Sequence, residues 1–193
     1  AVGGEPRSYA TTSIGGAPYG GTLSADTPDT VINFIINTDV NWNGTNGDPG
    51  AEQIFVTTNG DITLTELVGD LQAGHIHSTD GDVILTSPEA IIDADGTVTV
   101  DVTGDNITMT AGTGGTNGGI GKADDFLEIN GARNGGDTGD IDAFDTAAST
   151  TDGIFLDEVV GDMRVGQIFT SKDVSLRTVA GSIIESVADA NVD

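Results

Sequence analysis

Short stretches in which apolar and polar residues alternate recur along the chain and predict β-strands. Their apolar members lie at positions i and i+2, which places both side chains on one face of a strand. The pairs are Ile62/Leu64, Val83/Leu85, Ile107/Met109, Leu127/Ile129 and Ile154/Leu156. Their first residues are 21, 24, 20 and 27 positions apart, so the spacing averages 23 and four steps cover 92 residues. Gly-Asp pairs precede several stretches, as expected where a chain turns a corner into its next strand.

This pattern predicts an all-β fold, a right-handed parallel β-helix (β-solenoid) with about 23 residues per coil. Apolar side chains should point inward and stack on those of the coils above and below. We expect these inward residues to be Ile62, Leu64, Val83, Leu85, Ile107, Ile154, Leu156, Val174 and Leu176.

An internal duplication supports the solenoid. Residues 61–79 align without a gap on residues 153–171, at an offset of 92, and eight of the 19 positions are identical. The chain therefore divides into a degenerate or partial repeat (1–57), a repeat unit (58–149) and a partial second unit (150–193) within one continuous solenoid. A β-sandwich also has short alternating strands, but it does not need a copy that begins and ends in mid-pattern. Disorder is a further alternative, because a high net charge favours it. The strict alternation of apolar and polar residues argues against disorder.

Composition and charge narrow the classes of function. Six Lys and Arg stand against 31 Asp and Glu, a net charge of −25, so we expect no nucleic-acid partner. No cysteine is present, which excludes disulfides and thiolate metal sites. The apolar runs are too short to span a bilayer, and the first residues lack the pattern of a signal peptide, so we expect a mature chain or an excised fragment. Asp outnumbers Glu by 24 to 7 and Gly reaches 29, a composition typical of turns and strands.

One segment matches the opening of a calcium loop. Asp39, Asn41 and Asn43 alternate and are followed by Gly44, the D-x-[DN]-x-[DN]-G pattern in which alternate oxygens converge on the ion. The twelfth position, where a bidentate Glu is expected, holds Gly50, with Asp48 and Glu52 close by. We predict a calcium site at Asp39, Asn41, Asn43, Asp48 and Glu52, with a solvated turn as the alternative.

Two further groups of polar residues are candidate metal sites. Asp137, Asp140, Asp142 and Asp145 form a second acidic cluster, which we interpret as a solvated loop, although hard cations would relieve its self-repulsion. His75 and His77 flank Ile76, so both rings should point to the same face of a strand, opposite Ile76. Because no third ligand lies near them in the sequence, we interpret them as outward surface residues.

Catalysis is not expected. Parallel β-helices include polysaccharide lyases and epimerases, which need a basic residue to remove a proton. Arg164 and Arg177 lie in the duplicated stretch, but Gln72 and Thr86 replace them in the other copy, so no basic column forms. An anionic sugar would also be repelled by the charge of this chain.

Residues 106–130 and 153–186 resemble the repeats of large bacterial surface exoproteins. Thr110-Ala111-Gly112 to Gly121 with Leu127-Glu128-Ile129, then Gly153 to Ile168, then Asp173 to Ile183, are similar to repeats of the filamentous-haemagglutinin-like adhesins, including leukotoxin-like filamentous adhesins. The similarity extends over roughly the last 90 residues and over 60–94, and is poor over 1–57. It implies secretion, a parallel β-helical shaft, and a role in attachment or in building a surface filament.

We therefore expect a structural segment, the shaft of a secreted bacterial surface filament or adhesin, at the cell surface. The alternative is an extracellular calcium-dependent module that binds a glycan or a protein. Because exposed end coils are open edges, we expect them to meet other copies or a continuation of the same chain.

Overall fold

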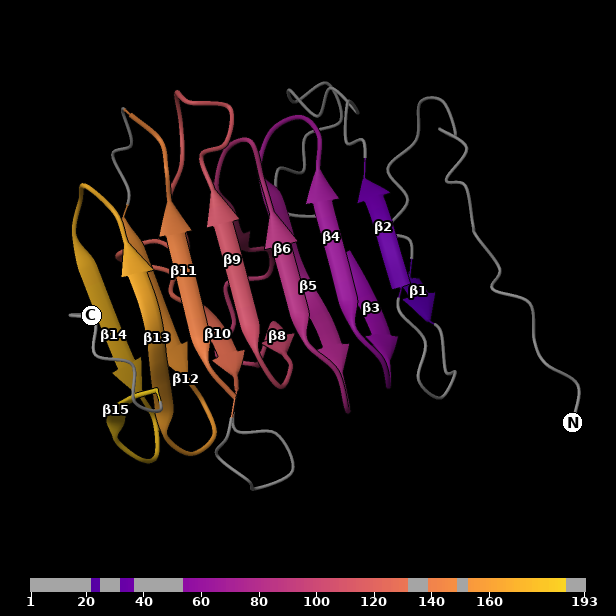
Figure 1. The fold of residues 1–193 in the computed structure, drawn as a ribbon, viewed down its shortest axis with the longest axis vertical. Helices are drawn as coiled ribbons and strands as arrows, with labels where there is room; N and C mark the ends of the chain where they lie inside the picture. Colours follow the sequence, from indigo (N-terminus) through magenta and orange to yellow (C-terminus); the bar gives the residue numbers. More distant parts are fainter. Residues whose placement is uncertain (1–21, 25–31, 37–53, 132–138, 149–152, 187–193) are drawn as a thin grey trace, which may run out of the picture.

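The computed structural model describes residues 22–24, 32–36, 54–131, 139–148 and 153–186, and every regular element among them is a β-strand (Figure 1). Because these residues contain no helix, they contain none that is long and apolar enough to cross a membrane.

The strands form two sheets, and all pairings between named strands are parallel. The eight-stranded sheet contains β1 (Thr22–Ser24), β3 (Ile54–Thr58), β5 (Leu71–Ser78), β7 (Ile91–Asp93), β8 (Val102–Thr103), β10 (Leu127–Asn130), β12 (Ile154–Glu158) and β14 (Val174–Thr178). The seven-stranded sheet contains β2 (Ile32–Ile36), β4 (Ile62–Glu66), β6 (Val83–Thr86), β9 (Ile107–Ala111), β11 (Ile141–Asp145), β13 (Met163–Phe169) and β15 (Ile183–Glu185).

The chain passes from one sheet to the other and returns beside the strand that it has just left, so the two layers advance together from β1 and β2 to β14 and β15 (Figure 1). This confirms the all-β prediction and is consistent with a parallel β-solenoid. Parallel pairing also argues against an antiparallel β-sandwich.

The predicted column of apolar pairs is confirmed in its first two steps and wrong afterwards. Ile62 pairs with Val83, and Val83 pairs with Ile107. Ile107 then pairs with Ile141, whereas Leu127 lies in the other sheet, where it pairs with Leu156. The pattern that marks an inward pair is the same in both sheets, so it cannot show which sheet a strand joins.

The duplication places equivalent residues in opposite sheets. β4 belongs to the seven-stranded sheet and its copy β12 to the eight-stranded one, and β5 and β13 are exchanged in the same way. From β4 the chain reaches β6, β9 and β11 in its own sheet before crossing to β12. The 92-residue offset is therefore three circuits and one further crossing, rather than the predicted four steps that average 23 residues.

The two copies nevertheless build the same corner after their first strand. Gly69 and Gly161 have positive φ angles of 87° and 80°, which favour glycine. The following Asp then accepts a backbone N–H from one circuit further on: Asp70 Oδ1 from Ala90 at 2.9 Å, and Asp162 Oδ1 from Ser182 at 2.6 Å.

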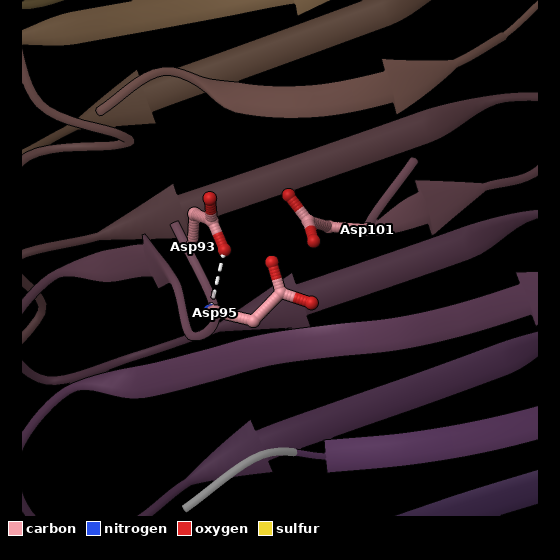
Figure 2. A group of neighbouring side chains, drawn as sticks. All are labelled: Asp93, Asp95 and Asp101. Carbon is pink, nitrogen blue, oxygen red and sulfur yellow. Dashed lines mark hydrogen bonds between the residues drawn. The ribbon is translucent and has the colours of Figure 1, made fainter. Parts of the chain in front are cut away.

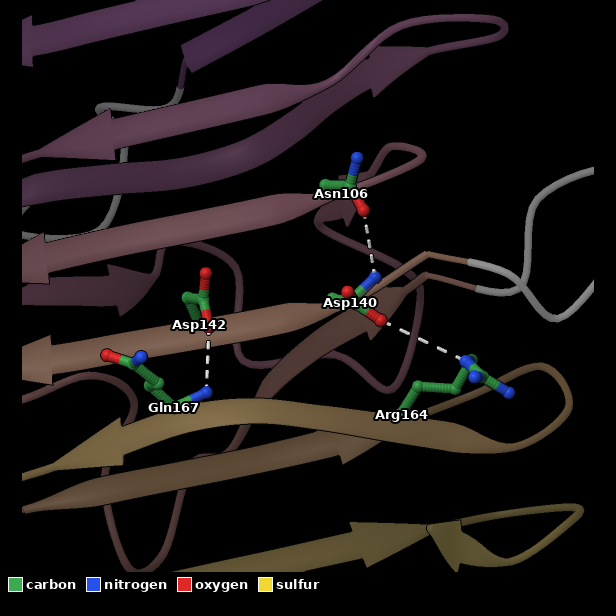
Figure 3. A network of polar contacts seen from close by, with 5 residues as sticks. All are labelled: Asn106, Asp140, Asp142, Arg164 and Gln167. Carbon is green, nitrogen blue, oxygen red and sulfur yellow. Dashed lines mark hydrogen bonds and ion pairs between the residues drawn. The ribbon is translucent and has the colours of Figure 1, made fainter. Parts of the chain in front are cut away.

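A second series of such bonds runs along the starts of the strands of the seven-stranded sheet. One Asp or Asn precedes each of β4, β6, β9 and β11. The side chain of each of the first three accepts the backbone N–H of the Asp or Asn that precedes the next of these strands. The bonds run from Asp82 to Asp61 (3.0 Å), from Asn106 to Asp82 (3.0 Å) and from Asp140 to Asn106 (3.1 Å). Figure 3 shows the last of them, beside the ion pair of Asp140 with Arg164. These side chains link successive circuits outside the backbone ladders.

The core is a stack of aliphatic side chains between the two sheets. Seven of the nine predicted inward residues are 0% exposed, the exceptions being Val174 and Leu176. Leu176 is partly buried against the core, and Val174 is 48% exposed. Val174 is inward by its register with Ile154, as predicted, but stays exposed because β14 is the last strand of its sheet in the described chain and has a neighbour on one side only.

Replacing Leu64 by Asp should unfold the protein. Leu64 is fully buried, so the substitution places an unpaired carboxylate in the stack, at a cost of more than about 3 kcal/mol. Circular dichroism and thermal denaturation measure the effect. Thr63→Asp, on the outer side of the same strand, is the matched control and should keep the fold; an unchanged spectrum for Leu64→Asp would contradict the inward assignment.

Candidate metal centre

The predicted calcium residues Asp39, Asn41, Asn43, Asp48 and Glu52 lie outside the described residues. That site stays a prediction.

The second acidic cluster links strands instead of forming a solvated loop. Asp142 and Asp145 lie in β11, so the loop interpretation was wrong for them, while Asp137 lies outside the described residues. Asp142 Oδ1 accepts the backbone N–H of Gln167 at 2.7 Å (Figure 3). Asp145 is buried and accepts a hydrogen bond from the Thr170 hydroxyl at 2.9 Å. Asp142 and Asp145 therefore serve as hydrogen-bond acceptors between β11 and β13 or the turn after it, and Asp140 forms an ion pair with Arg164.

The two histidines lie as predicted, on one face of β5 with Ile76 buried on the other. Their rings stack with centroids 5.4 Å apart and an interplanar angle of 6°. Burial, with a smaller contribution from His75, lowers the pKa of His77. Neither histidine joins the group of possible metal ligands found in the described part of the chain.

That group consists of Asp93, Asp95 and Asp101, and it lies where the solenoid is interrupted. β7 ends at Asp93 and β8 begins just after Asp101, yet both strands pair with β5, at Leu71–Ala73 and at Ile76–His77 respectively. The segment 94–101 therefore leaves the sheet and returns to the same level of the stack. Its two ends bring the three carboxylates together, with one ligand atom from each within 4.8 Å of the others (Figure 2).

In each of the three carboxylates, one oxygen accepts a hydrogen bond from the backbone. Asp93 Oδ1 accepts the N–H groups of Asp95 and Gly96 at 2.7 and 3.0 Å. Asp95 Oδ1 accepts the N–H of Thr97 at 2.8 Å, and Asp101 Oδ2 accepts that of Glu128 at 3.2 Å. These bonds fix the orientation of the carboxylates and leave their other oxygens for a ligand.

Asp93 and Asp101 are buried, with exposed fractions of 6% and 1%. Asp93 Oδ2 and Asp101 Oδ1 have no hydrogen-bond partner, although both atoms are inaccessible to solvent. Buried carboxylate oxygens normally have partners, so these two require an explanation. Asp95 is exposed and opens one side of the group to water.

Glu128 adds a fourth acidic group beside the three. It lies on β10, next to Asp101 in the register of β8 and β10, and is 4% exposed. Its Oε2 atom also lacks a hydrogen-bond partner. On β12, Asp157 is the partner of Glu128 in the parallel register, and it forms an ion pair with Arg177 at 2.8 Å. The ion pairs among the described residues do not include Glu128 or the three aspartates.

The electrostatics follow from this crowding. Burial, together with the charge of Asp93, raises the pKa of Asp101 to about 9. Burial and the charges of Asp93 and Asp157 raise the pKa of Glu128 to about 7, and burial raises that of Asp93 despite its two backbone hydrogen bonds. The group thus favours protons, or any other cation that can enter.

The donor set indicates which kind of cation fits. Carboxylate oxygens without His or Cys suit hard divalent ions such as Ca²⁺ and Mg²⁺, and do not suit zinc or copper. The sequence alone does not reveal this group, because Asp101 joins it only through the course of segment 94–101. A partial signal exists in Asp93-x-Asp95-Gly96, a shorter form of the calcium-loop pattern recognised at Asp39.

Comparison of the chain with protein-family models, with curated proteins and with solved structures gave no match. The class of the protein therefore rests on the fold described above, an all-β structure of two parallel sheets.

The stability of the metal-free protein should depend on the protonation of Asp101 and Glu128. Because both pKa values are raised in the folded state, the contribution of these groups is complete below about pH 4 and is lost as the pH rises through about 7 and about 9. Melting temperatures measured in chelator between pH 5 and 9 should fall less steeply for Asp101→Asn than for the wild type. Equal slopes would show that Asp101 does not titrate in this range.

Proposed function

We propose that this chain is a segment of the shaft of a secreted bacterial surface filament or adhesin, built as a right-handed parallel β-helix. Right-handedness is supported by the strong preference of parallel strand crossovers for that hand. The predicted coil of about 23 residues agrees with the shorter register steps, such as the 21 between Ile62 and Val83 and the 24 between Val83 and Ile107. Longer steps, such as the 34 between Ile107 and Ile141, belong to circuits with insertions.

The observation that carries the proposal is the last circuit of the stack. Val174 and Ile183 occupy inward positions, since their partners in the preceding circuit are Ile154 and Met163, both 0% exposed. Val174 and Ile183 themselves are 48% and 47% exposed. Within the described residues, nothing pairs with the far side of β14 or β15. An open edge with uncovered core positions favours stacking of a further coil, from another copy or from a continuation of the same chain.

Charge and repetition also support a structural role. Each circuit contacts mainly its neighbours, so a rod of this kind can be lengthened without a new core. The net charge of −25 favours solubility, and the repulsion between like charges opposes side-by-side aggregation of rods. Arg164 and Arg177 each face an Asp, at 3.9 and 2.8 Å, and so support a structural use of these basic residues.

Val174→Pro should block stacking at this edge while preserving the fold. Ile154 N–H donates to Asp173 O and Val179 N–H donates to Glu158 O, so the alternation of a parallel ladder points the N–H of Val174 away from β12. Proline at the first residue of an edge strand therefore removes no ladder bond of the folded chain. Sedimentation velocity and electron microscopy should show end-to-end oligomers or fibres for the wild type and isolated particles for the variant.

Val98→Pro serves as the control, since Val98 is 84% exposed and lies in segment 94–101, away from the last circuit. It should assemble like the wild type. Monodisperse wild-type particles at high concentration would count against the shaft. Binding in a glycan array would then favour the calcium-dependent module.

A further inference from the structure

We propose that Asp93, Asp95 and Asp101 bind a calcium ion, which fastens segment 94–101 to the sheet between β7 and β8. The ion would supply the missing partner of the buried oxygens Asp93 Oδ2 and Asp101 Oδ1. The proposal is independent of the role in a shaft.

The geometry is already prepared for a ligand. Three carboxylates converge within 4.8 Å, and each is oriented by a backbone N–H through one of its oxygens (Figure 2). Unpartnered buried oxygens are costly in a folded protein, and two of these three side chains contain one. An acidic patch that was merely solvated would have its oxygens in water.

The surrounding charge reinforces the same conclusion. Glu128 lies beside Asp101 on the next strand, and the ion pairs of the described residues leave this group uncompensated. Arg177 offsets the negative charge of Asp157, the neighbour of Glu128 on β12, and not that of Glu128 or the three aspartates. A divalent ion would offset two of these negative charges without any change of the fold.

Calcium suits the site better than magnesium. Ca²⁺ accepts six to eight oxygen ligands in irregular arrangements, whereas Mg²⁺ requires a nearly ideal octahedron and retains several of its waters. Here the ligands come from an irregular segment that joins two short strands, and the exposed Asp95 leaves room for water on one side.

Binding would couple three strands. Asp93 ends β7, Asp101 precedes β8, and the Asp101 carboxylate also receives the N–H of Glu128 on β10. A cation held between Asp93 and Asp101 would close segment 94–101 at its base and strengthen the contact between successive circuits.

Calorimetry of the chelator-treated full chain against CaCl₂ tests the proposal, with MgCl₂ as the comparison. We expect calcium binding with a rise in melting temperature, and weaker binding of magnesium. Asp101→Asn keeps the shape of the side chain and should weaken calcium binding by about tenfold or more, because affinity follows the number of charged ligands. Asp95→Asn, at an exposed position that should not disturb folding, should also weaken it. Glu128→Gln should have a smaller effect.

The matched control is Asp173→Asn, which removes one exposed carboxylate outside the group and should leave calcium affinity unchanged. Hydrogen exchange gives a second readout: calcium should slow exchange of the amides of Asp95, Gly96 and Thr97 in the wild type and not in Asp101→Asn. No calcium binding by the wild type would overturn the proposal. So would binding that persists in Asp95→Asn and Asp101→Asn but is lost in Asp39→Asn, since it would place the ion at the other predicted site.

Discussion

The parallel backbone ladder between successive circuits is the constraint on which the rest of this structure depends. Each strand must return in register above its predecessor, so that inward residues such as Ile62, Val83 and Ile107 meet and remain dry. A slip of one residue would turn the apolar face outward. The composition follows from this demand: strand residues supply the stack, and the corners need side chains that hold neighbouring circuits together.

Short acidic side chains fill that second role. Asp61 and Asp82 accept the first N–H groups of the following circuit, and Asp70 and Asp162 do the same at the duplicated corner. Asp is suited to this because its carboxylate stays close to the backbone, as in turns and helix caps. This use explains part of the excess of 24 Asp over 7 Glu, which solubility alone does not.

Sequence alone predicted the strand type, the parallel stacking and most of the core, because each depends on local alternation. It failed at Leu127, since membership of a sheet depends on how many residues each circuit contains, and the circuit from Ile107 to Ile141 contains 34 residues instead of about 23. It placed Val174 inward but could not show that this residue is exposed, because exposure at the end of a stack depends on the neighbouring strands. Asp93 and Asp95 form part of a calcium-loop pattern in the sequence, but Asp101 comes close to them only when segment 94–101 folds.

The interruption between β7 and β8 is where Asp93 and Asp101 are buried with oxygens that lack hydrogen-bond partners. Stability in a solenoid is approximately a sum over circuits and the interfaces between neighbours, so a weak circuit limits the length of chain that unfolds as one unit. Buried charge at Asp101 and Glu128 weakens this circuit as the pH rises. A cation bound there would therefore stabilise a circuit that its own buried carboxylates weaken, and through the interfaces with its neighbours a single site would act on more than one circuit.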